Sequence, residues 1–137
     1  MAYEFQVTID SSDPHTLADW WADALGWEVE PQDEAFIRDM VAKGHAQESE
    51  THTHNGKLVW RVGAAIHHPR APRVLFQRVP EAKTAKNRMH FDVRVDDREA
   101  VKERLLAAGA TFLHDGQQGP FTWVTMADPE GNEFCLT

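Results

Sequence analysis

Met89-His90-Phe91-Asp92-Val93 is the stretch of sequence that decides the fold, because it repeats a pattern from the start of the chain. The earlier copy is Phe5-Gln6-Val7-Thr8-Ile9. In both copies apolar and polar residues alternate, which is typical of a β-strand with one buried face. A helical stretch follows each copy and ends at a glycine, Gly26 in the first and Gly109 in the second. Two such strand–helix units predict two copies of one supersecondary module.

The composition indicates one globular domain over residues 1–137, since 42% hydrophobic and 26% charged residues are an ordinary balance for a protein with a core. The net charge of −8 argues against nucleic acid or an anionic membrane as a partner. The chain contains no apolar run long enough to span a membrane. A single cysteine, Cys135, and an N-terminus without a signal-peptide pattern predict a cytoplasmic protein.

Module one is predicted to occupy residues 1–80 and to contain an insert after its first helix. Asp13 is the expected N-cap of that helix, and Pro14 suits its first position. Asn55-Gly56 is a hairpin-type turn signal within the insert. In order, we expect a strand over 4–10, a helix over 14–25, a short strand over 27–30, a helix over 33–43, a polar loop over 45–55, and strands over 57–67 and 73–79.

A locally basic linker over residues 81–88 separates module one from module two, residues 89–137. Asp128-Pro129-Glu130-Gly131 predicts a type I turn before the last strand. In order, we expect a strand over 89–95, a helix over 97–108, a strand over 110–113, a loop over 116–120, and strands over 121–127 and 132–136.

Two segments resemble the vicinal oxygen chelate superfamily, which includes glyoxalases, bleomycin resistance proteins and extradiol dioxygenases. One is the final hairpin, residues 126–134, and the other is Leu75-Phe76-Gln77-Arg78-Val79-Pro80-Glu81 with residues 83–90, which is similar to a glyoxalase-like subgroup. The resemblance implies an α+β fold in which two βαβββ modules with pseudo-twofold symmetry form a cup-shaped mixed sheet. It also implies a homodimer.

The resemblance places metal ligands on the first and last strands of each module. In this sequence those positions fall on Gln6, Gln77, His90 and Cys135, and the carboxylate nearest to the last of them is Glu133. Hard cations prefer anionic oxygen ligands, which two amides and one imidazole do not supply. We therefore expect no intact catalytic metal site. If a divalent ion is bound (Ni, Zn, Mn or Fe), its expected ligands are Gln6, Gln77, His90 and Glu133.

The leading hypothesis is a small organic molecule bound in an aromatic, amide-lined cup, for sequestration or modest catalysis. Gln6 and His90 are expected to project into a common hollow. Together with them, the expected ligand-binding residues are Gln77, Trp60, Trp123 and Cys135. Without a metal, the best catalytic pair is His90 and Glu133, provided that burial raises the pKa of Glu133.

Two alternatives stay open: a metal-dependent lyase, isomerase or dioxygenase, and a non-catalytic interaction domain whose cup face is a partner surface. Other histidines carry weaker signals. His52-Thr53-His54 resembles a metal-binding pair, but in a polar loop we interpret it as solvated surface. His67 and His68 would point to opposite faces of a strand and make a poor chelate.

Overall fold

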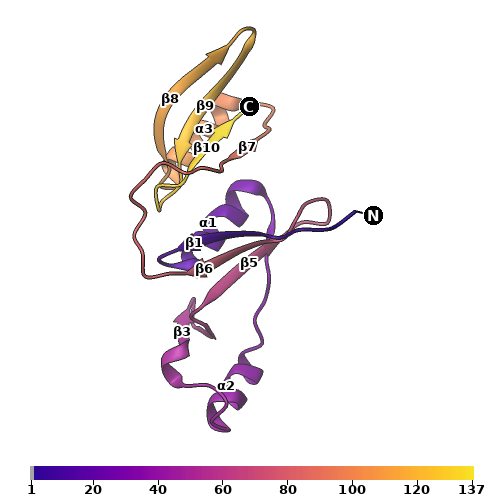
Figure 1. Ribbon diagram of the computed structural model, residues 1–137, viewed down its shortest axis with the longest axis vertical. Helices are drawn as coiled ribbons and strands as arrows, with labels where there is room; N and C mark the ends of the chain where they lie inside the picture. The colour runs from indigo at the N-terminus through magenta and orange to yellow at the C-terminus, as the bar shows by residue number, and fades with distance from the viewer. Residues whose placement is uncertain (1) are drawn as a thin grey trace. The chain divides into compact units, whose positions relative to one another are not determined.

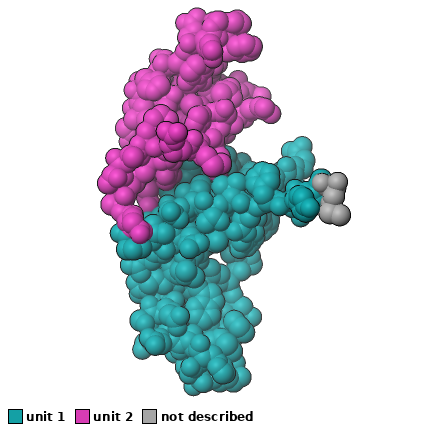
Figure 2. All heavy atoms as spheres, viewed as in Figure 1, with its two compact units in different colours: residues 1–80 teal, residues 81–137 magenta. Residues whose placement is uncertain are grey.

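A computed structural model describes residues 2–137 of the chain (Figure 1). The chain forms two compact units, Met1–Pro80 and Glu81–Thr137 (Figure 2). The boundary lies at the start of the basic segment 81–88, which belongs to the second unit. Both units combine helices and strands, and the described residues form three α-helices and ten strands with no closed barrel, so the predicted α+β class is confirmed. That the two units make one domain stays a prediction.

Unit 1 is built around a four-stranded sheet in the order β1-β6-β5-β2. β1 runs parallel to β6, and β5 is antiparallel to both of its neighbours. Helix α1 packs against one face of this sheet and buries Leu17 and Trp21 there. The elements are β1 (Val7–Ser11), α1 (Pro14–Leu25), β2 (Glu28–Val29), α2 (Glu34–Ala42), the 3₁₀ turn η1 (Glu48–Glu50), β3 (Thr51–His54), β4 (Lys57–Trp60), β5 (Gly63–His67) and β6 (Val74–Arg78).

Helix α1 begins and ends where the local sequence predicts. The side chain of Asp13 accepts hydrogen bonds from the Thr16 amide at 3.4 Å and the Thr16 hydroxyl at 2.8 Å. Pro14 occupies the start of the helix, where a missing N–H costs nothing. Gly26 ends it in the left-handed conformation, with φ of 69°.

The insert differs from the sequence prediction in two ways. Residues 51–54, expected in a polar loop, form β3 and pair with β4, so His52 and His54 are half-buried on a hairpin. The strand expected over 57–67 is two strands in different sheets. The side chain of Gln32 explains the break, because it accepts from the Trp60 amide and donates to the Gly63 carbonyl, both at 2.8 Å.

The turn that closes this hairpin is the predicted one. Asn55 and Gly56 both adopt positive φ, 51° and 78°. Two successive residues with positive φ are the requirement of the type I′ hairpin turn, which asparagine followed by glycine meets at low cost.

Unit 2 has the predicted βαβββ order, and its sheet order β7-β10-β9-β8 repeats the arrangement of unit 1. β7 is parallel to β10, as β1 is to β6. Helix α3 covers one face of the sheet (Figure 1). The elements are β7 (Phe91–Val93), α3 (Arg98–Ala107), β8 (Thr111–Gln118), β9 (Phe121–Ala127) and β10 (Glu133–Leu136).

The β8–β9 hairpin is longer than the sequence predicts. The loop expected over 116–120 is wrong, because β8 continues to Gln118 and only Gly119-Pro120 form the turn. The turn before β10 is confirmed: the Gly131 amide donates to the Asp128 carbonyl at 2.9 Å. Across residues 2–137, none of the helices is both long and apolar enough to cross a bilayer.

Candidate functional site

Apart from Trp60, which lies on β4 of the two-stranded sheet, the predicted site residues of each unit lie on the face of the four-stranded sheet that turns away from the helix. We call these faces open face 1 and open face 2. Along a strand, alternate side chains point to opposite faces. On β10, Phe134 and Leu136 are buried in the core, so Glu133 and Cys135 lie on open face 2.

The register of β1 and β6 places Gln6 beside Arg73 on open face 1. Val7 pairs with Val74, and one residue earlier the Arg73 Nη1 donates to Gln6 Oε1 at 2.7 Å. Gln77 pairs with Asp10, four residues further along β1, which is about 13 Å at the usual strand rise. The structure therefore does not bring Gln6 and Gln77 together as a ligand pair. Arg73 is not among the residues that the sequence predicts for the site.

Arg73 also holds Glu30, at the end of β2. Its Nε donates to both carboxylate oxygens, at 2.8 and 3.0 Å. The hydrogen bond from Arg73 is the main cause that keeps the pKa of Glu30 below its ordinary value, and His67 adds a smaller attraction. A guanidinium in contact with Gln6 opposes a cation at that position.

A recess of about 250 Å³ opens beside this ion pair. Trp60 and Leu75 give it apolar walls, and Gln32 supplies an amide. Its other lining residues are Glu30, Pro31, Asp33, Gly63, Ala64, Ala65 and Arg73. The recess thus combines an indole, an amide and a charge-balanced ion pair within unit 1 alone.

Open face 2 brings three potential metal ligands together. His90, Asp92 and Cys135 each offer one donor atom, and these atoms lie within 4.8 Å of one another. His90 Nε2 is 3.3 Å from Asp92 Oδ1, and Cys135 pairs with Asp92 across β7 and β10. Cys135 is 9% exposed, with its Sγ 3.6 Å from the Thr125 hydroxyl.

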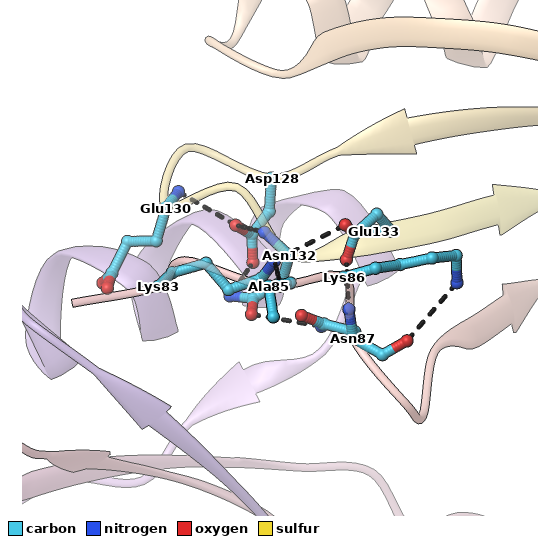
Figure 3. Close-up of polar contacts among 8 residues, drawn as sticks. All are labelled: Lys83, Ala85, Lys86, Asn87, Asp128, Glu130, Asn132 and Glu133. Atoms are coloured by element: carbon cyan, nitrogen blue, oxygen red, sulfur yellow. Dashed lines mark hydrogen bonds and ion pairs between the residues drawn. The ribbon is translucent and has the colours of Figure 1, made fainter. Parts of the chain in front are cut away.

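Glu133 lies next to His90 in the strand register but is engaged elsewhere. Its carboxylate accepts from the Asn87 amide at 3.0 Å and lies 3.4 Å from Lys83 Nζ (Figure 3). Burial raises the pKa of Glu133, but hydrogen bonds from the Asn87 amide and from its own amide, together with the Lys83 ammonium, lower it more, so its net pKa lies below the ordinary value. Glu133 is expected to exchange protons with His90 only if its pKa is raised. Its pKa is lowered instead, so this condition is not met.

We expect the substitution Glu133→Gln to loosen the segment 81–88. It removes the charge that Lys83 contacts and weakens the bond to the Asn87 amide, so the hydrogen-exchange protection of that amide should fall several-fold. The pKa of Glu133 is lower in the folded protein than in the unfolded chain. The ionised Glu133 therefore stabilises the folded protein fully at a pH above the unfolded-state pKa near 4.5, and this stabilisation is lost as the pH falls through the folded-state pKa. Glu81→Gln, at an exposed position, is the control. Unchanged protection of Asn87 in Glu133→Gln would contradict this prediction.

The two tryptophans predicted to bind ligand have different surroundings. Trp60 lines the recess of unit 1. Trp123 pairs with Gly116, and its ring occupies the space where a Cβ on Gly116 would lie, 2.1 Å from the ring atoms. Both are partly exposed, and Trp60 adjoins the recess of unit 1.

The metal site that the superfamily pattern implies does not fit these residues. Gln6 accepts a hydrogen bond from the Arg73 guanidinium, and Gln77 pairs with Asp10, four residues after Gln6 on β1. The carboxylate of Glu133 is engaged by Lys83 and by the Asn87 amide. The group that does converge includes Asp92, which follows His90 by two residues and so shares its face. An imidazole, a carboxylate and a thiolate favour a borderline ion such as Zn²⁺ over Mg²⁺ or Mn²⁺.

Comparison with known families agrees with this architecture. The model of a family described as a glyoxalase-like domain matches residues 6–137. The chain belongs to the glyoxalase-like domain family. This glyoxalase-like protein is therefore a member of the vicinal oxygen chelate superfamily, as the resemblance predicts. No curated protein sequence matches the chain.

Solved structures share the fold at low sequence identity. The bleomycin-binding protein of Streptomyces verticillus, complexed with copper(II)-bleomycin, has a TM-score of 0.56 and 17% identity over 100% of this chain and 98% of that one. The fosfomycin resistance protein FosX of Mesorhizobium loti has a TM-score of 0.63 and 12% identity, over 99% and 90%. A glyoxylase/bleomycin resistance protein/dioxygenase domain of Frankia has a TM-score of 0.60 and 12% identity, over 99% and 96%.

Proposed function

We propose that this glyoxalase-like protein binds a small organic molecule in the recess beside Trp60, without a catalytic metal of the superfamily type. The observation that carries the proposal is the recess itself, which combines the Trp60 indole and Leu75 with the amide of Gln32 and the Arg73–Glu30 pair. Apolar walls with a few placed polar groups are the usual composition of a small-molecule site. The volume of 250 Å³ suits a small molecule or one part of a larger ligand.

The structural neighbours support the same class of ligand. One was solved with copper(II)-bleomycin, and another is named for resistance to fosfomycin. The net charge of −8 favours a ligand that is neutral or cationic at neutral pH. Homodimerisation and a cytoplasmic location remain predictions from the sequence.

Calorimetric titration of the full chain tests the proposal, with copper(II)-bleomycin as the probe and the anion fosfomycin as the comparison expected to bind more weakly. Trp60→Ala removes the aromatic wall and should weaken binding roughly ten- to hundredfold. Trp27→Ala is the matched control, because Trp27 stacks on His68 at a ring-centre distance of 5.8 Å and does not line the recess. A probe that binds Trp60→Ala as tightly as the wild type would contradict the proposal for that probe.

The second candidate is a metal-dependent lyase, isomerase or dioxygenase, and the convergence of His90, Asp92 and Cys135 favours it. It requires stoichiometric metal in protein purified without chelators, and loss of that metal in Cys135→Ser. Protein with an occupied recess and no metal at this group would favour the first candidate.

A further inference from the structure

A cluster of three histidines lies in unit 1, between helix α1 and the hairpin β3–β4. His15 comes from the first turn of α1, while His52 and His54 are two residues apart on β3. The ring centres of His15 and His54 are 5.3 Å apart, and those of His15 and His52 are 6.4 Å apart. The hairpin therefore brings both of its histidines close to His15, which is 37 and 39 residues before them in the sequence.

Hydrogen bonds fix the tautomer of two of these rings. His15 Nε2 is 2.7 Å from the Trp60 carbonyl oxygen, which can only accept, so Nε2 carries the proton. His54 Nε2 is 2.6 Å from the Asp19 carboxylate, which also can only accept, so this Nε2 carries a proton as well. In the neutral form of either ring the lone pair is then on Nδ1. A histidine that donates one N–H to a carbonyl or carboxylate is the usual arrangement of a metal-ligating imidazole.

The ring of His15 is buried beneath the hairpin β3–β4. It is 6% exposed. Burial is the main cause that lowers its pKa; His54 and His52 lower it further, while the Trp60 carbonyl and Asp13 partly oppose this.

We propose that His15, His52 and His54 form a site for one divalent transition-metal ion of borderline softness, such as Zn²⁺, with Asp19 as the carboxylate that orients His54. Two imidazoles bound to one tetrahedral Zn²⁺ at about 2.0–2.1 Å have ring centres about 5 Å apart. The pair His15–His54 already has this spacing, whereas the ring centres of His15 and His52 are 6.4 Å apart, so His52 has to move toward His15 for all three rings to bind one ion. The ion would link the hairpin β3–β4 to helix α1 through its histidine ligands. The proposal does not depend on the recess binding a ligand.

The test uses the full chain carrying His90→Gln and Cys135→Ser, which removes the other converging group. We expect native mass spectrometry and calorimetry to find one Zn²⁺ per chain, and Co²⁺ to give the visible absorption of a tetrahedral nitrogen site. Adding His52→Gln or His54→Gln should abolish both signals, and Asp19→Asn should weaken Zn²⁺ binding roughly 10- to 100-fold. His45→Gln, an exposed histidine of the same insert, should leave binding unchanged.

Folding of each variant is checked by circular dichroism, and the long-range ¹H–¹⁵N spectrum of the histidine rings gives an independent readout. Zn²⁺ should shift the Nδ1 signals of His15 and His54. No Zn²⁺ bound by the His90→Gln/Cys135→Ser chain would overturn the proposal, as would binding that survives both His52→Gln and His54→Gln.

Discussion

Replacing Phe134 by alanine should lower the free energy of unfolding of unit 2 by about 3–5 kcal/mol. Phe134 is 1% exposed and lies on β10, which is hydrogen-bonded to β7 on one side and β9 on the other. Removing its ring leaves a cavity between the sheet and α3 that the surrounding strands can fill only in part. Native-state hydrogen exchange of the β9 and β10 amides measures this unit by itself.

Phe121→Ala is the matched control for this prediction. Phe121 starts β9 in the same sheet but is 73% exposed, so its loss should change stability by less than about 0.5 kcal/mol. Equal effects of the two substitutions would mean that β10 is not the centre of the unit 2 core. The position of Cys135 next to Phe134 would then be in question as well.

Gly63→Ala should cost about 1–3 kcal/mol and narrow the recess. A Cβ built on Gly63 would lie 2.8 Å from the carbonyl oxygen of Phe76 on the neighbouring strand. That oxygen belongs to the backbone of a paired strand, so relief requires β5 and β6 to shift relative to each other. Urea denaturation gives the stability change, and ligand titration gives the effect on the recess.

Gly116→Ala makes the comparison that isolates the backbone effect. There the added Cβ meets the Trp123 indole, a side chain that can rotate away. We expect a smaller loss of stability than in Gly63→Ala, together with a shift of the Trp123 indole resonance. A Gly63→Ala protein as stable as the wild type would show that β5 and β6 are less closely packed than the structure indicates.

Much of the fold can be predicted from the sequence because its signals are local. Helix α1 is set by Asp13, Pro14 and Gly26, each of which acts within one turn. The turns at Asn55-Gly56 and Asp128-Gly131 likewise follow from the conformations that their own residues prefer. The repeated strand pattern then supplies the βαβββ order of unit 2 without any knowledge of tertiary contacts.

The insert is predicted less well because its structure depends on contacts between distant residues. Residues 51–54 are polar, and they form a strand only because β4 pairs with them. The break after Trp60 depends on Gln32, which is bonded to both sides of it. Nothing in the composition near Gln32 distinguishes it from a solvated loop residue.

The site residues also divide into those that local sequence predicts and those that depend on contacts between distant residues. Asp92 could have been found from the sequence, since it follows His90 by two residues in the same strand. The partner of Gln6 could not have been found in this way. The register between the parallel strands β1 and β6 depends on how α1 and β5 pack against them, and the spacing along the sequence does not reveal it. The family resemblance implies Gln77 as the ligand from the last strand, whereas the structure places Arg73 beside Gln6. The engagement of Glu133 by Lys83 and Asn87 likewise depends on where the segment 81–88 folds back.

The central claim is that small organic molecules bind beside Trp60, and ligand mapping by NMR tests it most directly. The full chain has five tryptophans, so its indole N–H signals report five places at once. On titration with a library of neutral and cationic aromatic fragments, we predict that Trp60 shifts most, together with the backbone amides of Ala65 and Leu75. Fragments that bind but shift only the other four indoles, or no fragment that shifts Trp60 at all, would contradict the account.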